Sequence, residues 1–471
     1  MQNFGSFRDP AGYVFEFSDK IYRTVNLNGQ ADYELFVQSG LAAGLQEKRW
    51  LIPFHELSEE AAQELQRSDS FTGSPFRSAQ MWKMLEVEKV PFLSYPYEWC
   101  FHQIQDSAIL TLKIQLAALQ HGMTLKDASA YNIQMFRGRP IFIDILSFEK
   151  YEEGTPWKAY HQFVMHFLGP LMLMSQRDLR YSVLYRDWID GMPVDFVSSN
   201  LPWKSRFSPF AQIHIHYHAK LLRKYESTRG KQSKKVGKIS KKSLETLISG
   251  LLEFVQNLRI PQAITEWGDY YNDTNYTDEA FRTKGEMVRS LCESLRPRSV
   301  CDLGANCGEF SRVLPSDIPL IISADIDPVA VDKNYRQVRQ QKERNIYPIL
   351  QDLCNPSPGI GWMNRERSSF AERAKCDLVL ALALIHHLCI GNNLPLDYVA
   401  SFLRSLAPNA IVEFVPKEDS QTQRLLSSRE DIFPEYHLEK CLSVFGNFFS
   451  SAEQHPIPGT KRTILLFKDQ K

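Results

Sequence analysis

The chain has 471 residues, enough for more than one domain, and its apolar share of 43% is sufficient to build hydrophobic cores. Its 55 Lys and Arg balance 55 Asp and Glu, so the overall charge gives no reason to expect nucleic acid or a membrane as the main partner. Eight Cys without a CxxC pair, and no apolar run long enough to span a bilayer, favour a cytoplasmic protein with reduced thiols over a secreted or membrane protein.

The first predicted elements are two strands within residues 12–25, GYVFEFSDKIYRTV, with a turn at Asp19-Lys20. A helix follows at residues 104–119, where apolar residues at every third or fourth position keep one face hydrophobic. The pattern predicts an α+β region at the start of the chain.

A polar constellation comes directly after this helix. Asp127 and Asn132 stand five residues apart in a predicted loop, and a short hairpin then leads into an apolar strand that ends at Asp144. This spacing resembles the catalytic loop and metal-binding Asp of kinase-like phosphotransferases, and the resemblance implies that the three side chains could hold Mg²⁺ against the phosphates of ATP.

Several features depart from the kinase pattern. Leu125-Lys126 precede the loop Asp where His-Arg or His-Gly is typical, the glycine-rich cover is missing, and Arg23 stands where a phosphate-pairing Lys is expected. Asp127 as a loop cap and Asp144 as a turn residue are alternatives. An active kinase and a degenerate kinase fold that recognises a substrate therefore both stay open.

Two segments separate this region from the rest of the chain. His214, His216 and His218 would share one face of a strand, but helical continuation would scatter them, so we expect no metal site. Residues 220–242 are rich in Lys, Ser and Gly, which is typical of a linker or exposed helical arm. We predict a kinase-like domain at 1–219, a basic linker and helical arm at 220–261, and a second domain at 262–471.

The second domain begins with an aromatic segment, Trp267 to Tyr276, with Lys284 shortly after it. This segment could be buried in the core of the domain or could form a lid over a bound ligand, and the sequence does not decide between these two interpretations. A helix with apolar residues at 288, 291 and 295 follows, and strand-like runs then alternate with helix-like segments, as a parallel α/β sheet requires.

The strongest motif of the chain lies in this alternation. The strand SVCDL runs into Gly304-Ala-Asn-Cys-Gly308 and a helix follows, while the next strand ends at Asp325, 23 residues after Asp302. A strand, a glycine turn and a helix let a ligand approach backbone amides, and a carboxylate at this distance could hold a ribose. The order predicts a nucleotide-type site.

The glycine spacing separates two cofactors. A dinucleotide site would need G-x-G-x-x-G for a pyrophosphate, and the second of these glycines is absent. An acid two residues before G-x-x-x-G closely resembles the first motif of class I methyltransferases, whose cofactor is S-adenosylmethionine. The resemblance implies a Rossmann-like, seven-stranded domain in which Asp302 meets the methionine ammonium of the cofactor, directly or through water.

The same resemblance implies roles for other residues. Asp325 would hold the ribose, and Asp352 would meet the adenine amino group with Leu353 beside the ring. The full set of expected cofactor contacts is Asp302, Gly304, Asn306, Gly308, Asp325, Asp352, Leu353 and Ala383. A predicted fourth strand ends at His386-His387 and a fifth near Glu413, so these three residues are candidates for a catalytic base, with His387 favoured by resemblance over His386.

Taken whole, the strings SYPYEWCF, LKDASAYNIQ, PIFIDILSFEKY and EFVPKEDSQ resemble a group of two-domain bacterial proteins related to the nodulation protein NoeA. The resemblance implies a methyltransferase and names no acceptor. The leading hypothesis is transfer to a hydroxyl or amine of a small molecule or glycan, with the N-terminal domain helping to select it. A bifunctional methyltransferase and kinase, and a non-catalytic ligand-binding scaffold, are the alternatives.

Overall fold

A computed structural model describes residues 5–67, 81–226, 238–260, 278–427 and 430–469. The chain forms two compact units. The first unit comprises residues 1–97, 101–262 and 360–367, and the second comprises 98–100, 263–359 and 368–471. Each unit thus contains a short segment from the other half of the chain, whereas the domains predicted from the sequence were continuous.

The first unit starts with an antiparallel sheet of four strands in the order β1-β2-β4-β3. The strands are β1 (Val14–Phe17), β2 (Lys20–Asn26), β3 (Phe54–Glu56) and β4 (Met81–Val87), and the helices beside them are η1 (Leu27–Gly29), α1 (Gln30–Gln38), α2 (Leu41–Glu47) and α3 (Glu59–Arg67). Ser18 and Asp19 have φ of 48° and 62° and form the turn between β1 and β2. The turn therefore lies one residue earlier than predicted, and Lys20 begins β2.

The rest of the first unit is mostly helical and is built around α5 (Phe101–Gln120), as the apolar periodicity predicted. Short antiparallel pairs join β5 (Met123–Leu125) to β8 (Phe148–Lys150) and β6 (Ile133–Phe136) to β7 (Arg139–Phe142). The remaining helical elements are η2 (Pro96–Glu98), η3 (Ala130–Asn132), α6 (Tyr160–Phe163), η4 (Val164–Leu168), α7 (Gly169–Gln176), η5 (Leu179–Arg186), α8 (Val194–Asn200), η6 (Trp203–Phe207), α9 (Pro209–Ala211), η7 (Gln212–His216), α10 (Tyr217–Glu226), α11 (Lys241–Asn257) and η9 (Trp362–Asn364).

Helix α11 lies within the segment that the sequence predicted as a basic linker and arm. Leu244, Ile248, Leu251 and Val255 are fully or almost fully buried, because they repeat at helical spacing and form one apolar face. The Gln105 side chain of α5 donates to the carbonyl of Val255 at 2.7 Å. The second half of the segment is therefore a helix whose apolar face is packed within the first unit.

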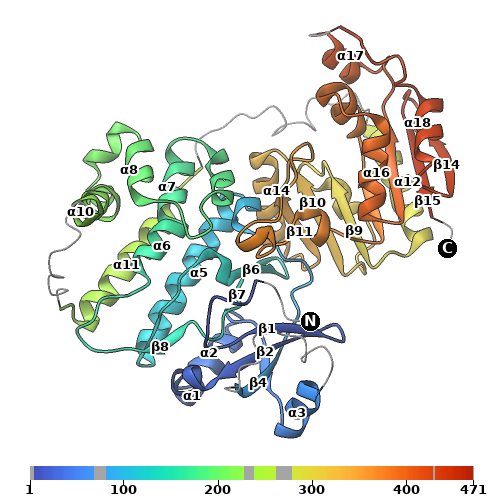
Figure 1. Cartoon of the computed structure of the whole chain (residues 1–471). Coiled ribbons are helices and arrows are strands. Elements are labelled where there is room, and N and C mark those ends of the chain that lie inside the picture. Colours follow the sequence, from blue (N-terminus) through green and yellow to red (C-terminus); the bar gives the residue numbers. More distant parts are fainter. Residues whose placement is uncertain (1–4, 68–80, 227–237, 261–277, 428–429, 470–471) are drawn as a thin grey trace. The chain divides into compact units, whose positions relative to one another are not determined.

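The second unit contains a seven-stranded sheet in the order β11-β10-β9-β12-β13-β15-β14 (Figure 1). Its strands are β9 (Ser299–Leu303), β10 (Leu320–Asp325), β11 (Ile346–Leu350), β12 (Leu378–Ala381), β13 (Asn409–Phe414), β14 (Ser451–Pro456) and β15 (Thr463–Lys468). The strands from β11 to β13 are parallel, and β15 pairs antiparallel with both β13 and β14. The alternating pattern predicted the parallel part of this sheet, and the resemblance to class I methyltransferases implied its seven strands.

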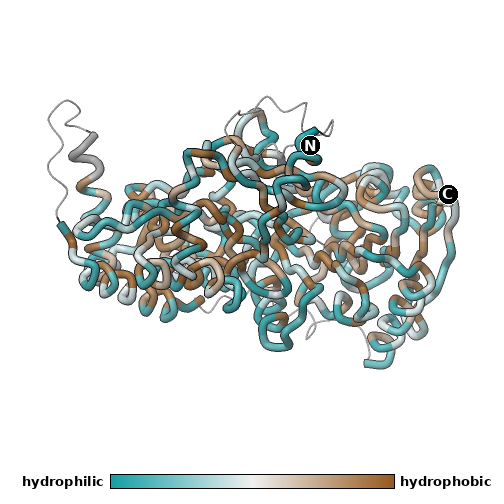
Figure 2. The backbone as a smooth tube through the Cα atoms, turned by 90° about the horizontal axis from the view of Figure 1, so that it is seen from below, coloured by the Kyte–Doolittle hydropathy of each residue, from teal (hydrophilic) through white to brown (hydrophobic). Residues whose placement is uncertain are grey.

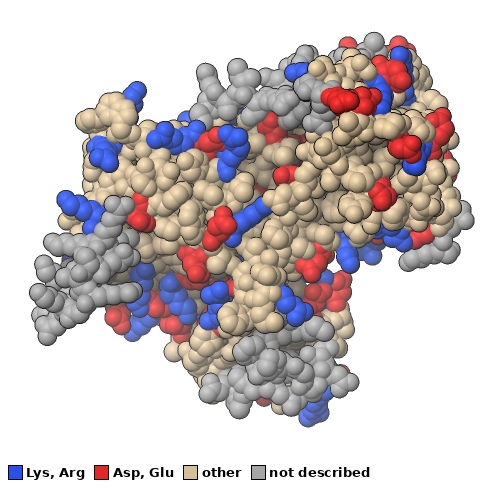
Figure 3. Space-filling model, turned by 45° about the horizontal axis from the view of Figure 1, so that its top comes forward, with Lys and Arg blue, Asp and Glu red and all other residues tan. Residues whose placement is uncertain are grey.

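Helices accompany this sheet, and most residues of its parallel strands are buried, as expected for a parallel sheet packed on two faces. The helices are α12 (Asp278–Leu295), α13 (Glu309–Val313), α14 (Pro328–Gln341), α15 (Phe370–Arg373), η10 (His387–Gly391), α16 (Leu396–Leu406), α17 (Ser420–Leu426) and α18 (Leu438–Phe445). Hydrophobic and hydrophilic stretches alternate along the chain (Figure 2), and acidic and basic side chains are interspersed on the face shown in Figure 3.

The strand order identifies where a ligand can bind. From β9 the chain continues to β10 and β11 on one side of the sheet, and it then returns to β12 on the other side of β9. The connection that leaves β9 and the connection that reaches β12 run in opposite directions, and parallel α/β sheets usually bind ligands at the carboxyl ends of two such strands. Leu303 and Ala381 are register partners at that edge.

Candidate cofactor and methyl-transfer site

The loop that follows β9 has a backbone suited to glycine. Gly304, Asn306 and Gly308 have φ of 72°, 50° and 79°. A Cβ on Gly308 would lie 2.6 Å from the side chains of Arg312 and Asn334. Both the left-handed φ and the lack of space favour glycine at position 308. Without a side chain at this position, a ligand can approach the backbone of the loop closely.

The carboxylate at the end of β10 is tied to this loop. Asp325 accepts hydrogen bonds from the backbone N–H groups of Asn306 and Asp327, each at 2.8 Å. It is 7% exposed, and burial raises its pKa to about 6, against the lowering effect of the two N–H groups. The structure therefore brings Asn306 and Asp325 together, two of the residues expected to contact the cofactor.

Asp302 lies near the end of β9 and is 1% exposed. The Ser311 hydroxyl donates to Asp302 Oδ2 at 2.7 Å. Burial raises the pKa of Asp302 to about 6, while the Ser311 hydrogen bond and the positive charge of Lys284 oppose the rise. Among the described residues, neither Asp302 nor Asp325 has a Lys or Arg within ion-pair distance. Both acids are therefore buried without a directly paired cation.

Asp352 and Leu353 follow β11, the outermost strand on this side of the sheet. Asp352 Oδ1 accepts the N–H of Cys354 at 2.8 Å, and both Asp352 and Leu353 are partly exposed. Because β9, β10 and β11 are parallel neighbours, their carboxyl ends bring Asp302, Asp325 and Asp352 to one edge of the sheet.

The chain after β12 differs from the prediction. The strand ends at Ala381 and not at His386-His387. Ala383 has φ of 48°, an uncommon value for a residue with a side chain, and it turns the chain into a helical segment. A Cβ on Gly304 would lie 3.2 Å from Leu384, so this turn sits against the glycine loop. Strained backbone of this kind is often found at ligand sites.

The two histidines beyond this turn are adjacent, with ring centroids 4.1 Å apart. His386 is 1% exposed, and neither ring nitrogen has a hydrogen-bond partner among the described residues. Burial lowers the pKa of His387 to about 4 and that of His386 well below its ordinary value, and neighbouring cationic groups add to the effect. Both imidazoles are therefore neutral at pH 7 and weakly basic.

Glu413, on β13, lies in a buried charge cluster. Its carboxylate pairs with Lys284 at 2.6 Å and with Arg462 at 3.3 Å, and Arg462 also pairs with Asp419 at 2.8 Å. The Lys284 ammonium lies 4.1 Å from the centroid of the Phe310 ring. Two cations already occupy the Glu413 carboxylate, which makes a proton-accepting role harder to fulfil.

The pairing of Lys284 and Arg462 with Glu413 was not predicted from the sequence. Lys284 lies on α12 four residues before Val288, so it shares the apolar, buried face of that helix. A charged residue on a buried face needs a partner of opposite charge. The position of Lys284 on the apolar face of the predicted helix could therefore have indicated a buried ion pair. The aromatic segment at 267–276, considered as a lid, lies outside the described residues.

The polar constellation of the first unit also comes together. The carbonyl of Asn132 accepts the N–H of Ile143 at 2.8 Å, which places the loop beside the strand that delivers Asp144. Burial, followed by the negative charge of Asp144, raises the pKa of Asp127. Arg23 pairs with Asp144 Oδ1 at 2.5 Å. Asp127, Asn132 and Asp144 are therefore neighbours, and Asp144 forms an ion pair with Arg23.

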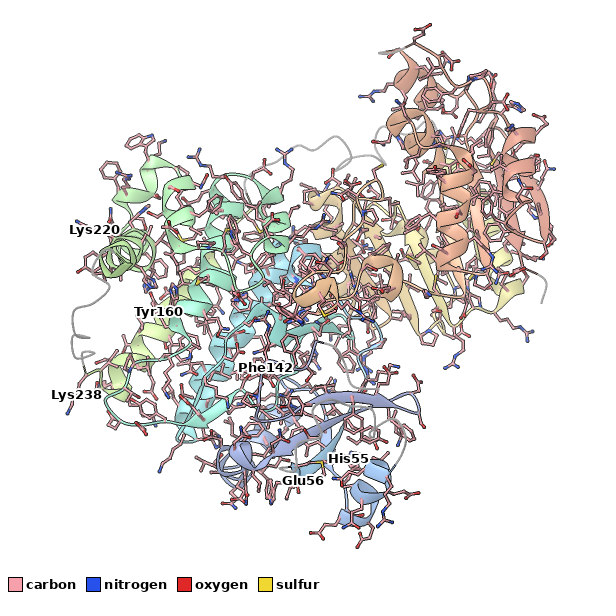
Figure 4. All side chains as sticks on the ribbon, in the orientation of Figure 1. His55, Glu56, Phe142, Tyr160, Lys220 and Lys238 are labelled. Atoms are coloured by element: carbon pink, nitrogen blue, oxygen red, sulfur yellow. The ribbon has the colours of Figure 1, made fainter. Side chains whose placement is uncertain are left out.

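The alternating histidines lie on η7 and α10, a helical segment that turns them in different directions. His214 pairs with the hydroxyl of Tyr160 at 2.6 Å, and His218 contacts His161 at 3.1 Å. Figure 4 labels Tyr160 on α6. His216 lies 2.9 Å from the hydroxyls of both Ser198 and Ser205. These contacts account for the three rings as packing residues.

A seven-stranded sheet of this order, with an acid and glycine loop after its central strand and an acid after the next, defines the class I methyltransferases, which use S-adenosylmethionine. No family model matches the chain. It is 36% identical over 476 aligned residues to nodulation protein NoeA of Rhizobium meliloti (strain 1021), covering 98% of this chain and 95% of that protein. The chain belongs to the NoeA family.

Solved structures similar to part of this chain include two methyltransferases and the protein WbdD. The N-methyltransferase NodS from Bradyrhizobium japonicum WM9 is 11% identical, covers 41% of this chain and 98% of its own, and has a TM-score of 0.31. Magnesium protoporphyrin IX methyltransferase (ChlM) from Synechocystis PCC 6803 is 19% identical, with coverage of 43% and 92% and a TM-score of 0.30. For WbdD the identity is 14%, the match spans 41% of each chain, and the TM-score is 0.29. In the part of the chain that the structure describes, no helix combines the length and the apolar character needed to cross a membrane.

Proposed function

We propose that this protein transfers the methyl group of S-adenosylmethionine to a hydroxyl or amine of a small molecule or glycan, and that the first unit helps to select that acceptor. One observation carries the proposal. Asp302 and Asp325 are buried at adjacent strand ends around a glycine loop, and neither has a directly paired cation among the described residues.

The chemistry of the cofactor fits these residues. S-adenosylmethionine carries a sulfonium and an ammonium, and it supplies an activated methyl group when bound. A buried carboxylate is stabilised by a nearby positive charge, so a cationic ligand would offset the burial cost that raises the pKa of Asp302. Asp325 retains lone pairs beyond its two N–H partners for ribose hydroxyls. Asp352, Leu353 and Ala383 complete the proposed cofactor surface.

On the acceptor side, we assign His387 the main role at the nucleophile. His387 is partly exposed whereas His386 is buried, so His387 is the more accessible of the two. A neutral imidazole can accept a hydrogen bond from an acceptor hydroxyl and orient its oxygen, although its low pKa makes it a weak base. Alignment in a dry site supplies much of the rate of such a displacement. Glu413, held by two cations, is the less favoured candidate.

The test of the cofactor assignment uses the full chain. Calorimetry with S-adenosylmethionine should show binding by the wild type and a large loss in Asp302→Asn, with Asp317→Asn as a control because Asp317 is exposed on the loop after α13. Equal affinity in wild type and Asp302→Asn would sink the assignment of the site.

The acceptor can be sought by incubating a cell extract with methyl-labelled S-adenosylmethionine. A small molecule or glycan that becomes labelled only with added wild-type protein supports the proposal, and His387→Ala should reduce labelling by about 100-fold while cofactor binding persists. Cofactor binding without any labelled product would favour the non-catalytic scaffold.

A second candidate function is phosphotransfer from Mg-ATP in the first unit, giving a bifunctional enzyme. It is favoured by the proximity of Asp127, Asn132 and Asp144, whose side chains could supply oxygen ligands. Mg²⁺-dependent ATP binding that is lost in Asp144→Asn would support it. The Arg23 guanidinium on Asp144 is the observation against it, because it occupies an oxygen that a metal would use.

A further inference from the structure

Large apolar side chains are exposed in one short stretch of the first unit. Thirteen such residues are more than 36% exposed in the described part of the chain, and five of them fall between residues 203 and 221. They are Trp203 (67%), Phe207 (76%), Ile213 (62%), Tyr217 (58%) and Leu221 (37%), which we call the aromatic ridge. Isolated exposed apolar residues are ordinary, whereas a cluster of this kind marks an interaction surface.

The ridge has a regular structural basis. Ile213, Tyr217 and Leu221 are spaced four apart along η7 and α10, so they follow one side of a continuous helical segment. His214 and Ile215, between them, are buried and anchor the opposite side. Within the part of the chain that the structure describes, these three side chains stay exposed while the opposite side of the segment is anchored.

The two aromatic residues come from the adjoining turn η6. The rings of Trp203 and Phe207 meet edge to face with centroids 5.5 Å apart. Two contacts fix η6 against η7: the Ser205 hydroxyl lies 2.9 Å from His216 Nε2, and Gln212 donates to the carbonyl of Arg206 at 2.6 Å. The five ridge residues thus belong to two segments that are joined side by side.

The charge of this stretch has one sign. Lys204, Arg206 and Lys220 are exposed among the ridge residues, and Figure 4 labels Lys220 on α10. The sequence has no Asp or Glu from 203 to 225, although the whole chain has as many acidic as basic residues. Residues 222–242 add nine Lys or Arg against the single acid Glu226. The surface therefore complements an anionic partner that can also accept apolar side chains.

We propose that the aromatic ridge docks this protein on the surface of an anionic phospholipid bilayer. Trp, Tyr and Phe beside Lys and Arg are typical of segments that lie in the headgroup region, where rings enter the acyl boundary and cations meet phosphates. Ile213 and Leu221 favour lipid over nucleic acid, because aliphatic side chains gain nothing from stacked bases or phosphates. This inference concerns the first unit and does not depend on the proposed methyl transfer.

The test is co-sedimentation of the full chain with vesicles. We expect binding to vesicles of 70% phosphatidylcholine and 30% phosphatidylglycerol in low salt, and little binding to pure phosphatidylcholine. Each basic residue near an anionic surface contributes about fivefold in affinity, so the triple variant Lys204→Gln, Arg206→Gln, Lys220→Gln should lose up to roughly 100-fold. The triple variant Phe207→Ser, Ile213→Ser, Tyr217→Ser should lose at least about tenfold.

Matched controls separate docking from misfolding. The double variant Tyr398→Ser, Ile432→Ser removes apolar residues that are 68% and 61% exposed in the second unit, and it should bind as the wild type does. All variants alter exposed positions and should keep the wild-type melting temperature. No binding to anionic vesicles, equal loss in the control, or a ridge-dependent dimer or RNA complex without vesicle binding would each overturn the proposal.

Discussion

The two units each place a pair of Asp side chains at a loop, but they treat the charge differently. In the second unit Asp302 and Asp325 are buried with hydrogen bonds from a hydroxyl and backbone N–H groups. In the first unit Asp144 is paired with the guanidinium of Arg23. A buried acid without a protein cation is poised to receive a cationic ligand, whereas a paired acid has its charge already neutralised. The comparison explains why the proposed cofactor site lies in the second unit.

The largest change in cofactor affinity is expected for a substitution of Asp302. Asp302→Asn removes the charge but keeps the shape, so the affinity for S-adenosylmethionine should fall roughly 10- to 100-fold at pH 7.5, the usual worth of a hydrogen bond to a charged group. Titration calorimetry measures this loss. The matched variant Asp144→Asn in the first unit should leave that affinity unchanged, and a comparable loss there would refute the assignment.

The pH dependence gives the next effect. Burial raises the pKa of both Asp302 and Asp325 to about 6, so their ionised forms prevail above pH 6 and are lost as the pH falls through it. Ionised Asp302 would attract the positive charge of the cofactor, and ionised Asp325 would accept hydrogen bonds from its ribose. Cofactor affinity should be flat near pH 7.5 and should fall by up to about tenfold per group for each pH unit below 6. Calorimetry from pH 5 to 7.5 tests this. Asp302→Asn should have the shallower profile, and a profile that rises toward pH 5 would contradict the idea.

The raised pKa values of Asp302 and Asp325 also affect the free energy of unfolding. An acid whose folded pKa is raised favours the folded state at pH below its unfolded pKa, and this contribution disappears as the pH rises through about 6. Bound S-adenosylmethionine should therefore raise the melting temperature more at pH 7.5 than at pH 5, as measured by thermal unfolding with and without cofactor.

In the first unit the informative change is Arg23→Gln. It leaves Asp144, whose side chain is 16% exposed, without its cation, and the first unit should lose about 1 to 3 kcal/mol of unfolding free energy. Urea unfolding followed by limited proteolysis measures this. The double variant Arg23→Gln, Asp144→Asn should recover part of the loss. Arg180→Gln, which breaks an exposed pair with Asp178, is the control and should have almost no effect.

The smallest effect is expected at Ser311, whose hydroxyl donates to Asp302. Ser311→Ala removes one hydrogen bond from the ionised acid, so the pKa of Asp302 should rise further and cofactor affinity at pH 7 should fall about fivefold. Ser294→Ala, at an exposed site on α12, serves as the reference. If affinity at pH 8 falls as much as at pH 6, Ser311 acts on packing and not on the charge of Asp302.

The sequence was sufficient for the parts of the fold that depend on local pattern. The strand SVCDL, the glycine turn and the acid at 325 lie within 27 residues, and their order predicted a parallel sheet with a nucleotide-type site at this loop. The choice of S-adenosylmethionine came from the resemblance to class I methyltransferases. The kinase-like interpretation of the first unit rests on a similarly local spacing and stays a prediction.

Other features depend on residues far apart in the sequence. Lys284 meets Glu413 across 129 positions and Arg23 meets Asp144 across 121, and no local pattern specifies either pair. The turn at Ala383 was missed for a different reason. An apolar run predicts a long strand, but β12 ends at Ala381, Ala383 adopts a positive φ, and Leu384 then lies beside Gly304.

Because each unit is built from non-contiguous segments, the chain cannot be divided into the two units by one cut. Residues 360–367 belong to the first unit although the chain on both sides of them builds the second, and residues 98–100 show the converse. A single cut after residue 262 would separate each unit from a piece of itself. Each half expressed alone would therefore lack a short segment of its unit: residues 360–367 for the first unit and residues 98–100 for the second.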